Sequence, residues 1–218
     1  MNLDTAEIIN KILMIPAILV AFTFHEYAHA ITADRLGDKT PRFQGRLTLN
    51  PIAHIDLMGF LLILVVGFGW AKPVETNPGA YKNYYKDDLK VSAAGPIANF
   101  ILGIVFAILL ILFTKFSPMQ GTLNEIIKSI LFITGSLNCI LFFLNLVPIP
   151  GFDGFHIVRD LFPKFFYNLS DSVTRYQFLI FMALLFPILP GKTSIFYYLV
   201  QVPGMLLFSL FRNIVEMI

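Results

Sequence analysis

The chain has 218 residues, of which 56% are hydrophobic and 14% are charged, and its mean hydropathy is +0.73. Because soluble domains are typically about 25% charged, this composition excludes an ordinary soluble protein and predicts an integral membrane protein. The net charge of +2 gives no reason to expect a nucleic-acid partner, and the single cysteine, Cys139, excludes an intramolecular disulfide.

The first apolar segment extends from about Ile8 to Ala33, which is long enough for a membrane-spanning helix of roughly 20 residues. The motif HEYAH lies near its end. His25 and His29 are four residues apart, so on a helix they share one face and can bind a single zinc ion. Glu26 is then placed to act on a zinc-bound water. The alternative is a polar patch that lines an ion or proton path.

A cleavable signal peptide is not expected, although Ala28–Ala30 imitates a cleavage site. The N-terminal region carries Asp4 and Glu7 against only Lys11, and a histidine–glutamate pair interrupts the approach to that site.

A short apolar segment, Leu57–Trp70, lies between two polar regions. The first polar region, Gly37–Asp56, contains Arg42–Leu49, which favours a short β-hairpin or an edge strand. Leu57–Trp70 has only 14 residues, which is short for a span and typical of a re-entrant segment. The second polar region is Ala71–Lys90.

Two further spans follow. Val91–Phe113 begins with small residues that permit close helix packing, and its polar Asn99 needs a hydrogen-bond partner. Glu125–Val147 is the next span. Two prolines separated by one residue then end the helix, so Pro148–Gly154 should be extended or turned and enclosed by protein or a water-filled cavity.

The remaining sequence contains a polar linker (Arg159–Arg175), a short apolar stretch (Tyr176–Leu189) and a last apolar run to about Phe211. The length of Tyr176–Leu189 leaves open whether it crosses the membrane. With it, the predicted fold is an all-α polytopic membrane protein of about five transmembrane helices and a re-entrant segment, in a single domain of residues 1–218.

Catalytic zinc sites usually have three protein ligands and a water, whereas HEYAH supplies two. The best third candidate is Asp153, a carboxylate in a Gly-rich turn beside a span; a turn-capping role is the alternative. If Leu57–Trp70 crossed the membrane, Asp153 would emerge opposite the histidines. If it is re-entrant, all three side chains lie on one side, here called the histidine side.

Lysine and arginine counts test this choice. The re-entrant arrangement puts 12 of these residues on the histidine side and 4 on the opposite side, namely Lys11, Lys115, Lys128 and Lys192; a full crossing gives 7 and 9. The positive-inside rule favours the re-entrant arrangement and makes the histidine side, with the expected hairpin, cytoplasmic. The positions of Lys192 and Arg212 assume that Tyr176–Leu189 crosses.

Three motifs now stand in order: HEYAH at His25–His29, GPIAN at Gly95–Asn99 and NLVPIPGFDG at Asn145–Gly154. With them the chain resembles the site-2 protease family of intramembrane zinc metalloproteases over roughly residues 8 to 160. It looks like a compact branch without PDZ or CBS domains. One departure is Phe152, where the family commonly has leucine.

The resemblance implies Zn²⁺ held by His25, His29 and Asp153, with Glu26 as general base. For Glu26 the alternative is an ion pair with a nearby arginine. By the family analogy, Asn145 stabilises the oxyanion or orients substrate, against a role in helix–helix hydrogen bonding.

Three further polar residues are candidates for supporting roles. Asn99 is expected to fix one span against another. His156 lies two residues after Gly154 and either supports the metal ligands or is an interfacial histidine. His54 could approach the site from its loop and occupy the open metal position in a resting state. The Arg42–Leu49 strand could hold an extended substrate by β-addition.

The sequence therefore predicts a protease that cleaves transmembrane protein substrates near the cytoplasmic face of a lipid bilayer, in a prokaryotic plasma membrane. The alternatives are a transporter or ion channel, and a zinc-binding membrane scaffold without catalytic activity. Against the first, no inverted repeat is evident and the polar groups cluster at one depth. Substrate, activating signal and oligomeric state are left open.

Overall fold

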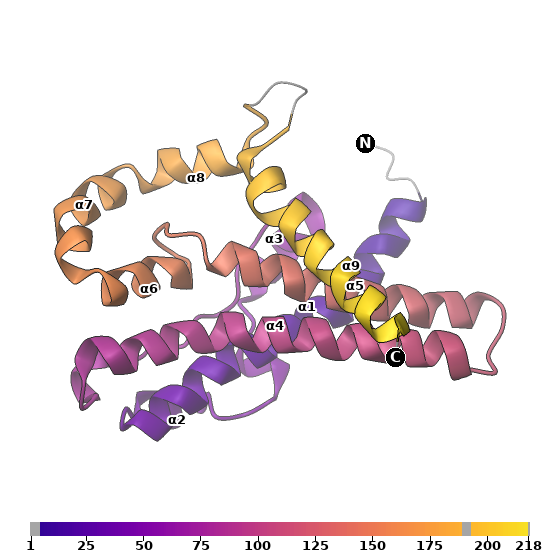
Figure 1. The fold of residues 1–218 in the computed structure, drawn as a ribbon, viewed down its shortest axis with the longest axis horizontal. Coiled ribbons are helices and arrows are strands. Elements are labelled where there is room, and N and C mark those ends of the chain that lie inside the picture. Colours follow the sequence, from indigo (N-terminus) through magenta and orange to yellow (C-terminus); the bar gives the residue numbers. More distant parts are fainter. Residues whose placement is uncertain (1–4, 189–192, 218) are drawn as a thin grey trace.

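The computed structural model describes residues 5–188 and 193–217. Its long helices are α1, α4 and α5, with the π-helical turn η3 leading into α9 (Figure 1). Their bounds are Thr5–Leu36, Tyr84–Phe116, Thr122–Asn145, Tyr197–Gln201 and Val202–Met217. In the described part of the chain four helical segments are long and apolar enough to cross a membrane, so this is a multi-pass membrane protein.

The spanning helices are longer than their apolar segments. α4 has 33 residues and is therefore about 50 Å long, against a hydrocarbon thickness of about 30 Å. Its polar first turns, Tyr84–Lys90, lie outside the predicted span and extend the helix beyond the apolar region. α1 likewise extends the predicted segment at both ends.

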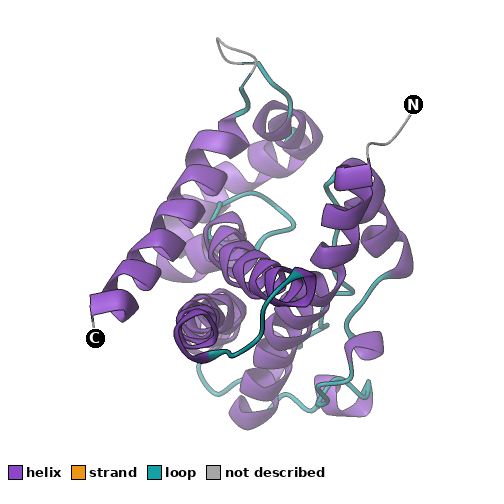
Figure 2. Ribbon diagram, turned by 90° about the vertical axis from the view of Figure 1, so that its right-hand side faces the viewer, coloured by secondary structure: helices purple, strands orange, loops and turns teal. Residues whose placement is uncertain are grey.

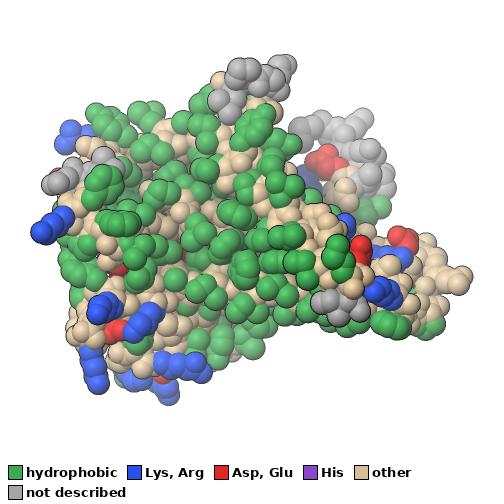
Figure 3. All heavy atoms as spheres, viewed as in Figure 1, with side chains coloured by type: hydrophobic (Ala, Val, Ile, Leu, Met, Phe, Trp, Pro, Cys, Tyr) green, Lys and Arg blue, Asp and Glu red, His purple; other side chains and the backbone are tan. Residues whose placement is uncertain are grey.

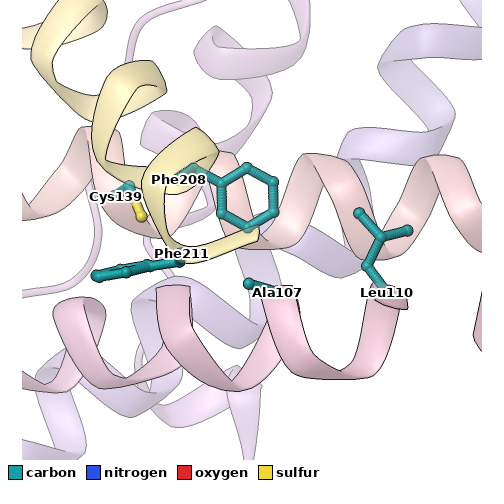
Figure 4. Packing of buried hydrophobic residues seen from close by; sticks show 5 residues of the cluster. All are labelled: Ala107, Leu110, Cys139, Phe208 and Phe211. Carbon is teal, nitrogen blue, oxygen red and sulfur yellow. The ribbon is translucent and has the colours of Figure 1, made fainter. Parts of the chain in front are cut away.

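The helix α9 packs across α4 and α5, and α1 packs on their other side (Figures 1 and 2). Figure 4 shows the buried cluster at this junction, which consists of Ala107, Leu110, Cys139, Phe208 and Phe211. Small residues permit the close approach. A Cβ at Gly103 would lie 2.5 Å from Cys139 Sγ, and one at Gly204 would lie 2.7 Å from Ile140 Cα. In lipid such van der Waals packing is the main source of helix association.

The short apolar segment forms α3 (Leu57–Val66), whose 10 residues make it about 15 Å long. Gly67, with φ 81°, ends the helix and the chain doubles back. A Cβ at Gly59 would lie 3.0 Å from the carbonyl carbon of Trp70, and an antiparallel bridge pairs Ile55 with Ala71. The segment thus begins and ends at one place, which is the geometry of a re-entrant segment and not of a crossing.

The expected hairpin at Arg42–Leu49 is wrong. Arg42 belongs to the short helix α2 (Thr40–Phe43), and residues 44–49 form turns and bends with no strand. Pro41 lies in the first turn of α2, where its missing N–H removes no helical hydrogen bond and its fixed φ suits the helix. Arg42 also donates to Asp34 at 2.8 and 2.9 Å, which fixes α2 against the end of α1.

Five spanning helices were expected, and the described residues contain four. α8 (Gln177–Leu185) has nine residues and is about 14 Å long, too short to cross. Together with α6 (Asp153–Leu161) and α7 (Pro163–Arg175) it forms an arm beside the bundle (Figure 1). Leu189, the end of the expected span, lies outside the described residues.

The direction of α9 corrects the position of one arginine. Val200, just before α9, packs on Val147 at the end of α5, whereas Arg212 lies over Phe132 and lines a cavity with Lys115 and Lys128. Arg212 is therefore on the side opposite the histidines.

With this correction, the described lysines and arginines number 11 on the histidine side and four on the opposite side, and Lys192 lies outside the described residues. The 11 are Arg35, Lys39, Arg42, Arg46, Lys72, Lys82, Lys86, Lys90, Arg159, Lys164 and Arg175. On the visible face they gather towards the end that holds α2 and α7 (Figure 3). The excess of lysine and arginine on the histidine side, from which the re-entrant arrangement was predicted, therefore remains after this correction.

Candidate metal centre

Three potential metal ligands converge from the end of α1 and the start of α6. His25 Nε2 and His29 Nε2 are 3.1 Å apart, and each lies 3.3 Å from an oxygen of Asp153. Both histidines are buried and Asp153 is half-buried. The helical spacing of HEYAH brings the two imidazoles together, and the turn after α5 brings the carboxylate to them.

The outer nitrogens of both imidazoles are already engaged. His25 Nδ1 is 2.7 Å from Asn99 Oδ1, and His29 Nδ1 is 2.7 Å from the Val91 carbonyl oxygen. Since both partners are acceptors, each Nδ1 carries the proton and donates it, which leaves the Nε2 lone pairs facing Asp153. This is the tautomer that a metal-ligating histidine requires.

The amide of Asn99 is itself held in one orientation. Its Nδ2 donates to Asn138 Oδ1 at 2.8 Å and to the Ala21 carbonyl at 3.3 Å, while Asn138 Nδ2 donates to the Thr134 carbonyl at 2.8 Å. Both asparagine side chains are fully buried. The polar residue that the sequence left in need of a partner thus connects α1, α4 and α5 and orients His25.

Gly95 provides the space in which the imidazoles lie. A Cβ there would be 2.5 Å from His25 Cε1, 2.7 Å from His25 Nε2 and closer still to His29 Nε2. In the sequence, Gly95 belongs to the small residues that permit helix packing and to the GPIAN motif, and neither pattern identified the histidines as its neighbours. The contact with the histidines crosses between α1 and α4, so the local sequence carried no signal for it.

Asp153 is placed by a turn that only a small following residue permits. After Pro148–Phe152 the chain enters α6, and a Cβ at Gly154 would lie 2.5 Å from the Leu146 carbonyl carbon and 2.7 Å from the Val147 oxygen. Further along α6, Arg159 pairs with Asp88 of α4. This ion pair, which sequence analysis missed, ties the helix that carries Asp153 to the helix behind the histidines.

The donor set fits a zinc ion. A tetrahedral ion with ligand bonds of about 2.0–2.1 Å separates its ligand atoms by about 3.3–3.4 Å. The two Nε2 atoms are 3.1 Å apart, each lies 3.3 Å from a different oxygen of Asp153, and one ligand atom from each residue can be chosen so that all lie within 4.8 Å of one another. In addition, Asp153 Oδ2 is buried and has no hydrogen-bond partner in the described part of the protein. Two neutral imidazoles and a carboxylate are a ligand set typical of zinc hydrolases.

Glu26 is buried beside the potential metal ligands, but its own contacts are with the segment that follows the re-entrant helix and with Arg46. Its Oε2 accepts a hydrogen bond from the Val74 amide at 2.8 Å and lies 3.8 Å from the Arg46 guanidinium. Arg46 donates to the carbonyls of Ala53 and Lys72, at the two ends of the re-entrant segment. Burial lowers the pKa of Arg46, and the charge of Glu26 opposes that shift.

His54 lies apart from the metal ligands. Its Nε2 donates to the Thr48 carbonyl at 2.7 Å, and its backbone carbonyl accepts from the Lys72 amide at 2.9 Å. The side chain is fully buried, and burial lowers its pKa. It holds the loop around the re-entrant segment and does not occupy a metal position.

A cleft of about 850 Å³ surrounds the potential ligands and opens between the long helices, the re-entrant segment and α8. Asn145 and His156 both line it, although Asn145 Nδ2 donates to the Leu141 carbonyl at 3.1 Å, within its own helix. Aromatic side chains line much of the apolar wall, namely Phe22, Phe68, Trp70, Phe152 and Phe181, and Val74, Val91, Leu141 and Leu144 extend it. The cleft is therefore a mainly apolar space with the polar cluster at its wall, as small-molecule and peptide sites usually are.

Comparison with known proteins agrees with this chemistry. The model of peptidase family M50 matches residues 13–128 and 115–188. Relatives named "Putative zinc metalloprotease" include YwhC of Bacillus subtilis, 39% identical over 172 residues that make up 78% of each chain. Rip2 of Mycolicibacterium smegmatis is 32% identical over 149 residues, 66% of this chain and 55% of Rip2. No solved structure matches the chain significantly. The chain therefore belongs to peptidase family M50, the site-2 proteases, and is a zinc metalloprotease of the membrane.

Proposed function

We propose that this metalloprotease hydrolyses peptide bonds of transmembrane protein substrates near the cytoplasmic face of a prokaryotic plasma membrane, as a step in regulated intramembrane proteolysis. The observation that carries the proposal is the convergence of His25, His29 and Asp153 in a cleft between apolar helices. A protease with its site at this depth meets substrates that are themselves in the bilayer.

His25, His29 and Asp153 would hold the zinc ion. When bound, zinc polarises the scissile carbonyl and lowers the pKa of an attacking water. Asn99 and the Val91 carbonyl each accept a hydrogen bond from an Nδ1–H, which directs the two Nε2 atoms at the metal position. Asn99 and Val91 thus contribute by orienting the two imidazole rings.

Glu26 is proposed as the general base, which takes a proton from the attacking water and passes it to the leaving amine. Two contacts support this role. The Val74 amide holds one oxygen, Oε2, in place, whereas Oε1 has no hydrogen bond to the described residues and is free to accept a proton. Arg46, at 3.8 Å from Oε2, forms an ion pair that keeps the carboxylate at this position.

Asn145 is proposed to donate a hydrogen bond to the developing oxyanion or to the substrate backbone. It lines the cleft from the end of α5, at the start of the turn that delivers Asp153. Its Nδ2 gives one hydrogen to the Leu141 carbonyl, and the second N–H of the amide makes no hydrogen bond to the described residues and can serve this role. His156, also on the cleft wall, is proposed to contact substrate rather than metal.

The cytoplasmic orientation rests on the lysine and arginine bias. Eleven described basic residues flank the metal side against four on the opposite side, and the positive-inside rule then assigns the metal side to the cytoplasm.

The direct test is cleavage of a membrane-tethered reporter in proteoliposomes by wild type and Glu26→Gln. Glutamine can still accept the Val74 hydrogen bond but cannot take a proton, so we expect unchanged zinc content and at least a 100-fold loss of cleavage. Glu7→Gln, near the far end of the same helix, is the matched control and should cleave normally. Full activity of Glu26→Gln would refute the base assignment, and no cleavage by zinc-loaded wild type would favour the inactive scaffold.

A further inference from the structure

The opposite side of the protein has few basic residues, and most of them meet at one place. Of the four lysines and arginines described there, Lys115, Lys128 and Arg212 line a single cavity of about 530 Å³, and only Lys11 lies elsewhere. They come from three elements: the last turn of α4, the first turns of α5, and α9. The fold therefore concentrates positive charge on a side that otherwise lacks it.

Arg212 is the central group of this cavity. Its guanidinium lies 5.7 Å above the Phe132 ring, and its Nε is buried without a hydrogen-bond partner in the described residues. Buried donors are nearly always paired, so an unpaired guanidinium nitrogen beside a cavity indicates a ligand that accepts hydrogen bonds.

The other charges leave a positive balance. Lys128 pairs with Glu125 at 3.2 Å, and Lys115 makes no ion pair with the described chain. Glu216 also lines the cavity, one turn beyond Arg212 on α9, without an ion pair to it in the described structure. With Glu125 included, three cations face two carboxylates, and the remaining positive charge favours an anion.

The rest of the wall is apolar. Leu110, Ile111 and Ile133 form it, and Leu110 continues into the cluster shown in Figure 4. Asn99, beside the metal ligands, and Lys115 are separated by 16 residues of the same helix, about 24 Å along its axis. The cavity is thus distinct from the cleft around the metal centre.

We propose that this cavity binds an anionic phospholipid through its phosphate. Arg212 and Lys115 donate to the phosphate oxygens, the Ser129 hydroxyl at the rim is a further donor, and the acyl chains follow the apolar wall into the bilayer. Basic pockets between transmembrane helices are suited to such headgroups, and the ends of α4 and α5 put this pocket at the level of the membrane surface.

The test is a lipid titration of the purified, full-length, zinc-loaded protein in detergent, followed by native mass spectrometry. Phosphatidylglycerol should bind at one site, and the double variant Lys115→Gln/Arg212→Gln should bind it about 30-fold more weakly. Lys11→Gln removes a cation from the same side outside the cavity and should bind as wild type does. Arg212→Lys keeps the charge and should lose less than Arg212→Gln.

Each other outcome overturns the proposal. If the double variant bound phosphatidylglycerol as tightly as wild type, the lipid site would have to lie outside this cavity. Equal binding of zwitterionic phosphatidylcholine would remove the role of charge, and glycerol 1-phosphate that binds as tightly as phosphatidylglycerol would make a soluble phosphate the ligand. Unchanged zinc content of the double variant, measured in the same samples, shows that it has folded.

Discussion

Replacing Gly95 with alanine should remove zinc from the protein while leaving most of the fold intact. The added Cβ would lie 2.5 Å from His25 Cε1, whereas ordinary van der Waals contact begins at 3.4 Å, so the ring must move by roughly 0.9 Å. The two imidazoles cannot swing away freely, because hydrogen bonds of 2.7 Å to Asn99 and Val91 hold them from behind.

A displacement of this size exceeds what a zinc site tolerates. Metal–ligand distances vary by about 0.2 Å in well-formed sites, and changes in supporting residues alone already cost 10–100-fold in affinity. We therefore expect Gly95→Ala to weaken zinc binding by at least about 100-fold. The assay is zinc content by elemental analysis after dialysis against a graded series of chelator concentrations.

Gly103→Ala is the matched control. It adds the same methyl group to the same helix, and its Cβ would meet Cys139 Sγ at 2.5 Å, but it faces α5 and not the histidines. It should lower the thermal unfolding midpoint and keep its zinc. Wild-type zinc affinity in Gly95→Ala would refute the reasoning.

Two further predictions concern residues near the site. Asn99→Ala removes the acceptor that orients His25 and should weaken zinc binding about 10–100-fold. Asn138→Ala removes only a hydrogen-bond partner of the Asn99 amide and should weaken zinc binding less. Equal zinc affinities of the two variants in chelator competition would contradict this. His54 has a lowered pKa through burial, with Arg46 adding to the shift and Glu26 and the Thr48 carbonyl opposing it. Below about pH 6.5 the His54 side chain of the unfolded chain takes up a proton, whereas burial keeps the folded side chain neutral. As the pH decreases through this range, the free energy of unfolding should therefore decrease more steeply in wild type than in His54→Gln. Parallel pH profiles of thermal unfolding for the two proteins would contradict this.

The parts of the fold that follow from residue spacing and from the number of membrane crossings were predictable from sequence. Helical spacing alone brings His25 and His29 together. The short length of Leu57–Trp70 and the distribution of lysine and arginine predicted that this segment returns to its starting side, and its two ends do meet at the Ile55–Ala71 bridge. Residue spacing, segment length and the distribution of charge can all be read directly from the sequence.

The parts that depend on tertiary contacts were missed. The helix α2 replaced the expected hairpin because Asp34 of α1 binds Arg42, an ion pair that local pattern does not reveal. The acceptor of His25 is 74 residues away on α4, so its identity could not be read from either motif. Tyr176–Leu189 was apolar enough to suggest a span, but its helix ends at Leu185, just before Pro187.

The most direct test of the account is the zinc content of wild type and Asp153→Ala, purified without added metal and dialysed against a weak chelator. Asp171→Ala, which removes an exposed carboxylate on α7, is the control. The account predicts about one zinc per chain in wild type and control and almost none in Asp153→Ala. Zinc retained by Asp153→Ala at the wild-type level would contradict the three-ligand site.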